Sequence, residues 1–283
     1  MRQRETKLKK LLLIAASAAA ISLLGSCSLG SGAKRQELRL SGIEKLDAGD
    51  YEEAIGDLEE ALSMGKGKVG QMELDILKYR AEAEVKIGDY SAAAHTYGIL
   101  MEVDGEKPEY TELRCMLNVR AGNTDQAMED YKKLYQAYTG TDPASKTSGD
   151  SGDPEEGTGQ DKRTQLTKLI KDIGKALKSQ GKEPEALAFY EQAEADGLAD
   201  SEIYNHIGLC YLEKGEYIKA GQVFEKGINA PDQAAAADLA FNRAVALEYQ
   251  RDYAGALKAF ESYISQYGSD DRAEHEIAFL KTR

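Results

Sequence analysis

The sequence has 283 residues, with 36 Lys and Arg against 49 Asp and Glu, so its formal net charge is −13. This acidic balance argues against nucleic acid as a partner, because phosphate binding needs clustered basic side chains. A hydrophobic share of 42% excludes a wholly disordered chain, and three cysteines are too few for a disulfide scaffold.

The first 26 residues have the pattern of a secretory signal. Residues 1–10 carry five basic side chains and one acidic one, and residues 11–24 form an uncharged stretch rich in Leu and Ala. Fourteen helical residues extend roughly 21 Å, which is less than the ~30 Å hydrocarbon core of a bilayer. We therefore expect residues 1–26 to be a cleaved signal peptide and not a transmembrane helix.

The end of this segment, Leu24-Gly25-Ser26-Cys27, resembles the lipobox of bacterial lipoproteins. The resemblance implies cleavage before Cys27, transfer of a diacylglycerol to its thiol, and further acylation with fatty acids such as palmitate. Two or more acyl chains give a stable anchor where one chain would be marginal. Residues 27–34 would then be a lipidated, flexible tether. The alternative is an ordinary signal peptide with an incidental cysteine.

The rest of the chain repeats one pattern six times. Its clearest form is Gly-Asp-Tyr-x-x-Ala, which begins at Gly49 and again at Gly88. Each alanine is followed four residues later by a large residue and preceded twelve residues earlier by a small one. In chain order, the small, alanine and large residues are Gly42, Ala54, Leu58; Ala81, Ala93, Tyr97; Cys115, Ala127, Tyr131; Gly174, Ala186, Tyr190; Gly208, Ala220, Phe224; and Ala244, Ala256, Phe260.

This pattern resembles the tetratricopeptide repeat (TPR), a helix–turn–helix of 34 residues. Glycine at the turn can adopt the left-handed conformation that ends the first helix. The small residues allow close approach of the paired helices, and we expect the large residue to fill the gap toward the neighbouring repeat. The resemblance implies an all-α TPR solenoid. The Trp that opens the family's first helix is absent throughout, and a generic helical bundle is the alternative.

We assign repeats one to three to residues 35–138 and repeats four to six to residues 164–270. The step from Ala127 to Ala186 is 59 residues, 25 more than one repeat. Residues 139–163 account for the excess and are rich in Gly, Ser, Thr and Asp, so we expect a disordered acidic linker. This linker either loops out of one continuous superhelix or separates two modules of three repeats.

Residues 271–283 are predicted to form a C-terminal capping helix. Its apolar face would consist of Ala273, Ile277, Ala278 and Leu280.

The sequence offers no convincing catalytic or metal-binding set. The three histidines, His95, His206 and His275, fall on different predicted helices, so a zinc site lacks ligands. A Gly-Asp-Ser-Gly phrase at residues 149–152 lies in the predicted linker, which supplies no rigid base or oxyanion hole. Cys115 and Cys210 are expected to be buried free thiols. We predict no cofactor, no metal and no enzymatic activity.

The family resemblance implies that the first helices line a concave groove. Lys168, Lys171, Lys175 and Lys178 would lie on one stripe of the first helix of repeat four. With Asn205, Leu209, Phe241, Asn242 and Val245, these are the candidate groove residues. They would suit a peptide that carries carboxylates, with Asn205 and Asn242 bonding its backbone. The alternative is that the lysines only solvate and compensate an acidic surface.

The combined expectation is a non-enzymatic scaffold, anchored by lipid outside the cytoplasm, that binds protein or peptide partners. It would sit on the outer face of the cell membrane or, in a host with two membranes, in the periplasm or at the outer membrane. The lipid contacts the membrane, and no nucleic acid is involved. The alternative function is a structural subunit of an envelope complex for secretion, outer-membrane assembly or pilus assembly.

Overall fold

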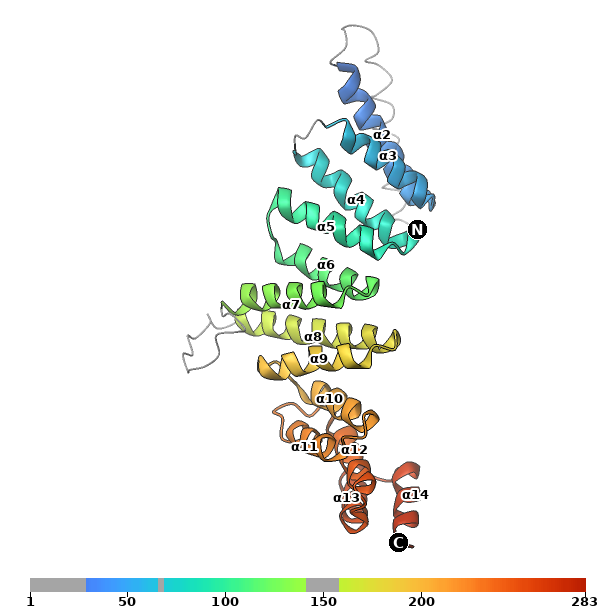
Figure 1. The fold of residues 1–283 in the computed structure, drawn as a ribbon, viewed down its shortest axis with the longest axis vertical. Helices are drawn as coiled ribbons and strands as arrows, with labels where there is room; N and C mark the ends of the chain where they lie inside the picture. Colours follow the sequence, from blue (N-terminus) through green and yellow to red (C-terminus); the bar gives the residue numbers. More distant parts are fainter. Residues whose placement is uncertain (1–28, 66–68, 141–157) are drawn as a thin grey trace. The chain divides into compact units, whose positions relative to one another are not determined.

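The computed structural model describes residues 29–65, 69–140 and 158–283. All thirteen secondary-structure elements in these residues are α-helices, which confirms the all-α prediction (Figure 1). The predicted signal peptide, the lipobox and Cys27 lie outside the described residues, and so do residues 141–157 of the predicted linker.

The chain divides into two compact units, one up to Ala83 and one from Glu84 onward. The first unit contains α2 (Leu29–Ala48), α3 (Tyr51–Ser63) and most of α4 (Gln71–Ile87), which crosses the boundary. The helices of the second unit follow one another as antiparallel hairpins with a single helix at the end (Figure 1). They are α5 (Tyr90–Asp104), α6 (Pro108–Ala121), α7 (Thr124–Thr139), α8 (Thr158–Ser179), α9 (Glu183–Ala195), α10 (Ser201–Glu213), α11 (Tyr217–Ile228), α12 (Ala236–Tyr249), α13 (Tyr253–Tyr267) and α14 (Asp271–Leu280).

The turn inside each of the six repeats has the same backbone geometry. Just beyond the end of the first helix, a single residue takes a positive φ. The N–H of the residue that follows it donates to the carbonyl five residues earlier, at 2.8 to 3.0 Å. This is the hydrogen bond of the Schellman motif, which satisfies a free carbonyl at the helix end. Five of the residues at positive φ are glycines, as predicted, and the sixth is Arg251, with φ of 66°.

Small residues set the distance between the two helices of a repeat. A methyl group added to Gly174 would overlap the ring of Tyr190, and one added to Gly208 would overlap Phe224. The large residue therefore lies directly over the small residue of its own hairpin. It packs within the hairpin because the missing side chain leaves room there. It also contacts the neighbouring repeat, as predicted, since Tyr131 packs edge-on against Phe189 and Tyr190 stacks on His206.

The helices on either side of the predicted linker share one core. A continuous cluster of buried side chains runs from α6 to α11 and includes Tyr131, Leu166 and Tyr190. The hydroxyl of Tyr131 in α7 donates to Asp196 Oδ2 at 2.8 Å, beyond the end of α9. Repeats three and four therefore pack against each other. This contact favours one continuous array of repeats and not two separate modules of three.

Two predicted boundaries are shifted by longer helices. Helix α2 begins at Leu29, so residues 29–34 are helical where a flexible tether was expected. Helix α8 begins at Thr158, so the insertion is shorter than residues 139–163. Adding turns to a formed helix is far easier than starting one. The first part of α8 is also fixed by Arg163, whose Nη2 donates to the Gly197 carbonyl at 2.6 Å.

The C-terminal helix α14 packs on the last hairpin. Ala273 and Leu280 are buried, and Ile277 packs against the same cluster in α12 and α13. Ala278 is exposed, contrary to the prediction. It lies one residue beyond Ile277, which places it about 100° away around the helix.

Candidate functional site

The four predicted lysines lie on one face of α8, because their spacing of three and four residues matches the helical period. The structure divides them into two pairs. Lys168 and Lys175 are exposed and form no hydrogen bond or ion pair with another described residue. Lys171 and Lys178 are half-buried and contact acidic residues of the next repeat.

Lys171 links repeat four to repeat five. Its Nζ lies 2.9 Å from Asp200 Oδ2 and 2.5 Å from Glu202 Oε2. Burial alone would lower the pKa of Lys171, but the hydrogen bonds to Glu202 and Asp200 outweigh it and raise this pKa. The hydrogen bond from Lys171 lowers the pKa of Glu202. Lys178 forms a longer contact, with its Nζ 3.8 Å from Glu213 Oε1.

The same relation between repeats recurs in the first unit. Arg39 Nε donates to Asp75 Oδ2 at 2.7 Å. Arg39 and Lys171 each lie three residues before the small residue of their repeat, and Asp75 and Glu202 each lie six residues before that of the next. These cations therefore stabilise the contact between neighbouring repeats. For Lys171 this favours the alternative in which the lysine compensates acidic residues of this protein and does not bind a peptide.

The two predicted amides lie together. Asn242 Nδ2 in α12 donates to Asn205 Oδ1 in α10 at 2.8 Å. This bond fixes both side chains and uses one donor and one acceptor. Each amide still has hydrogen-bonding capacity, since Asn205 retains its NH₂ group and Asn242 its carbonyl oxygen. A backbone could bond this pair without breaking it.

The three apolar candidates contribute mainly to packing. Phe241 packs edge-on against Phe260 and Tyr263, with ring centroids 5.3 and 5.6 Å apart, and the guanidinium of Arg272 lies 4.5 Å from its centroid. Val245 contacts the same cluster. Leu209 packs beside Phe224 and Leu239 in the cluster between repeats five and six. Arg272 of the capping helix therefore covers one side of Phe241, and the cap packs on the same cluster.

His206 follows Asn205 in α10 and lies near Lys178 and Lys175 of the lysine stripe. Its ring stacks on Tyr190, with centroids 5.2 Å apart and planes 17° apart, and its Nδ1 is buried without a hydrogen-bond partner among the described residues. Burial lowers the pKa of His206, and the nearby ammonium groups of Lys178 and Lys175 lower it further. The imidazole is therefore a neutral part of this surface near pH 7.

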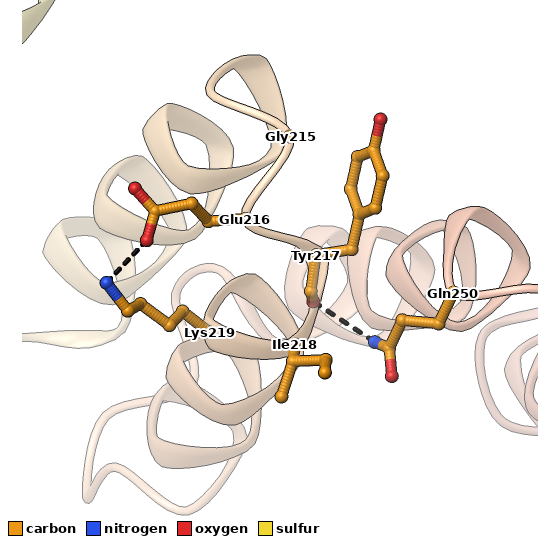
Figure 2. A pocket seen from close by; sticks show the side chains of 6 residues that line it. All are labelled: Gly215, Glu216, Tyr217, Ile218, Lys219 and Gln250. Carbon is orange, nitrogen blue, oxygen red and sulfur yellow. Dashed lines mark hydrogen bonds and ion pairs between the residues drawn. The ribbon is translucent and has the colours of Figure 1, made fainter.

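A separate pocket of about 480 Å³ lies where α11 begins, between repeats five and six (Figure 2). Ile218 and Tyr217 line it, and Gln250 Nε2 donates to the Tyr217 carbonyl at 3.1 Å. Ile218 is 67% exposed, and the adjoining Tyr249, stacked on Tyr217, is 57% exposed. The sequence analysis did not predict this patch. The feature that could have indicated it is Ile218, an aliphatic residue at one of the variable positions of the repeated Gly-Asp-Tyr-x-x-Ala pattern.

The described residues contain no group of three or more His, Cys, Asp or Glu side chains arranged to hold a metal ion. Cys115 and Cys210 are free and buried, as predicted, and burial raises the pKa of each thiol. Within the described ranges, no helix combines the length and the apolar character needed to cross a bilayer.

Several solved structures resemble this chain. The C-terminal part of a TPR repeat-containing protein from Cytophaga hutchinsonii is 18% identical, with a TM-score of 0.42, over 80% of this chain and 77% of that one. A MamA protein is 17% identical, with a TM-score of 0.41, over 72% and 95% of the two chains. A tetratricopeptide repeat protein from Parabacteroides merdae is 15% identical, with a TM-score of 0.35, over 88% and 99%.

The sequence also matches the tetratricopeptide repeat as a family. One form of the repeat matches residues 40–97, 79–141 and 171–235, and a second form matches residues 238–269. These matches cover more than half of the chain, and the gap at residues 142–170 contains most of the predicted linker. The chain belongs to the tetratricopeptide repeat family.

Proposed function

We propose that this protein is a non-enzymatic scaffold that binds a protein or peptide partner on the first-helix face of repeats four to six. Tetratricopeptide repeats generally mediate protein–protein interactions, and such scaffolds are typically not catalytic. One observation carries the proposal for this face. Lys168 and Lys175 are exposed and unpaired among the described residues, beside an amide pair that retains hydrogen-bonding capacity.

The partner would present carboxylates to Lys175 and backbone groups to Asn205 and Asn242. Lys171 is not part of this set, because its ammonium group is held by Asp200 and Glu202. Electrostatic complementarity of this kind contributes mostly to association rate and specificity, so binding should weaken as salt is raised.

Site-specific photocrosslinking tests this proposal. A photoreactive amino acid would replace Lys175 in one variant and Lys258 in a matched control. Lys258 is an exposed lysine of α13, which is the second helix of repeat six and so does not belong to the first-helix face. We expect a discrete crosslinked partner from position 175 that is absent from position 258. The doubly reversed variant Lys168→Glu/Lys175→Glu should reduce capture of that partner, and unchanged capture would contradict the assignment of this face.

We further propose that the protein is held outside the cytoplasm by lipid on Cys27. Support comes from the sequence alone, namely the basic segment, the short apolar segment and Leu24-Gly25-Ser26 before the cysteine. Labelled palmitate should enter the full-length protein, and Cys27→Ala should abolish labelling and release the protein from membranes. Labelling that persists in Cys27→Ala would contradict this anchor.

The second candidate function is a structural subunit of an envelope complex. The patch of Ile218, Tyr217 and Tyr249 favours it, because exposed apolar side chains gathered on one surface mark interaction sites. An obligate subunit should co-purify with a partner in fixed ratio, and Ile218→Asp should release that partner. A protein that purifies alone as a monomer and is unaffected by Ile218→Asp would exclude this function.

A further inference from the structure

A second pocket lies on the first-helix side where repeat three meets repeat four. It has a volume of about 470 Å³ and is formed by α6, α7 and α8. Leu169, which is buried, and the half-buried Met116 and Tyr138 supply its apolar floor. Its polar lining includes Glu109, Glu112, Lys168 and Asp172.

This junction differs from two others, the one between repeats one and two and the one between repeats four and five, which each carry an ion pair at the equivalent positions. Glu112 lies three residues before the small residue of repeat three, and Lys168 lies six residues before that of repeat four. The equivalent residues form ion pairs in Arg39–Asp75 and Lys171–Glu202. Glu112 and Lys168 carry opposite charges but form no ion pair with each other. Both residues line the pocket, so the pocket lies where an ion pair joins the repeats at the two other junctions.

The pocket is left with an excess of negative charge. Glu109, Glu112 and Asp172 form no hydrogen bond or ion pair with another described residue. Lys168 is the one cation among the described side chains that line it. A cationic group entering the pocket would gain favourable interaction with these carboxylates, whereas an anionic group would be repelled.

The floor fits a long cationic side chain. The aliphatic stems of Lys and Arg pack on apolar surfaces such as Met116 and Leu169 while their charged ends stay near polar groups. The ring of Tyr138 already has an ammonium group near one face, since Lys162 Nζ lies 5.8 Å from its centroid. Burial and the charges of Glu112 and Glu109, which line the same pocket, raise the pKa of the Tyr138 hydroxyl.

We propose that this pocket between α6, α7 and α8 binds a Lys or Arg side chain of the partner. The inference rests on the proposed function, in which the first-helix face binds a peptide segment. It adds that the segment carries a basic residue next to the part that faces Lys175. The partner segment therefore carries both acidic and basic side chains. The basic side chain distinguishes it from segments that are only acidic.

A random peptide library displayed on phage provides the probe, with the detergent-solubilised full-length protein as bait. We expect the selected peptides to share a Lys or Arg at one position. Replacing that residue by Gln in a synthetic peptide should weaken binding about tenfold, the size of a charge-assisted contact. Selected peptides without a shared basic residue would overturn the pocket assignment and leave the proposed function standing. Failure to select any peptide would overturn both.

A double-mutant cycle locates the contact. Glu109→Gln/Glu112→Gln removes charge from the rim with little change of shape, and Glu129→Gln on the exposed surface of α7 is the matched control. The penalty for changing the peptide's basic residue to Gln should nearly vanish in the rim variant and persist in Glu129→Gln. An equal penalty in wild type and rim variant would overturn the assignment. Circular dichroism confirms that both variants fold.

Discussion

Repeats three and four place a tyrosine at the same position, but the two hydroxyl groups have different surroundings. Tyr131 donates to Asp196 Oδ2 at 2.8 Å, and Asp196 is almost fully buried. The hydroxyl of Tyr190 is buried without a partner among the described residues. The repeat therefore determines where the ring lies, whereas the partner of the hydroxyl depends on a residue outside the repeated phrase.

The small residues opposite these tyrosines differ as well. In repeat three, Cys115 Sγ donates to the Ala127 carbonyl at 3.2 Å. In repeat four the equivalent residue is Gly174, and the end of the Tyr190 side chain occupies the space where a Cβ would be. Repeat four is thus a tighter hairpin that requires glycine, whereas repeat three accommodates a thiol.

The largest effect should come from filling this space. Gly174→Ala would force its methyl group into Tyr190, and overpacking a tight core typically costs about 1–3 kcal/mol. We expect the free energy of unfolding, measured with urea and circular dichroism, to fall toward the upper end of that range. Gly56→Ala is the control, because its methyl group would meet nothing within 4 Å in α3. That variant should be more stable by about 0.5–1 kcal/mol. Equal behaviour of the two variants would refute the steric account.

Removing each hydroxyl group in turn tests the difference between the two repeats directly. Tyr131→Phe leaves Asp196 without one of its donors, so we expect a loss of about 1–3 kcal/mol. Tyr190→Phe removes a buried hydroxyl that has no partner, so the protein should be equally stable or more stable. Urea unfolding of the two variants in parallel measures the difference. A comparable loss in Tyr190→Phe would show that its hydroxyl has a partner in solution.

The turns give the next smaller effect. Gly215→Ala places a methyl group at a φ of 75°, which should cost about 1 kcal/mol. Arg251→Gly relieves the same strain at the sixth turn, although the greater freedom of glycine in the unfolded chain offsets part of the gain. We therefore expect a small increase in thermal stability for Arg251→Gly. A decrease would indicate that the Arg251 side chain makes a stabilising contact that outweighs its backbone strain.

The sequence predicted the helices and turns of this protein well, because they depend on local rules. The recurring alanine and glycine residues locate each hairpin, and the positive φ at Gly181 and Gly215 follows from their place in the phrase. The ends of α2 and α8 were less predictable. The hydrogen bond of Arg163 to Gly197 that fixes the start of α8 joins residues 34 positions apart.

The site was less predictable than the fold, because a side chain's availability depends on its neighbours in the next repeat. Spacing placed the four lysines on one face of α8, but it did not show that Asp200 and Glu202 hold Lys171. It also did not show that Arg272 of the cap covers Phe241. The ion pairs that join repeats one and two and repeats four and five were present in the sequence as opposite charges at equivalent positions. It could be interpreted only once the structure gave the register.

The smallest effect should come from His206, which stacks on Tyr190 in the tighter of the two repeats. Burial and two lysines lower its pKa below the ordinary 6.5. As the pH falls below 6.5, the unfolded chain binds a proton before the folded chain does, so stability must decrease. His206→Phe should flatten the pH dependence of unfolding between about pH 7 and about pH 5, a range in which few other groups titrate. The control is His275→Gln, which replaces a histidine whose side chain is 82% exposed and so accounts for the effect of changing a surface histidine. If the profile of His206→Phe keeps the wild-type slope, another group is responsible, and the imidazole stacked on Tyr190 is not the source of the acid sensitivity.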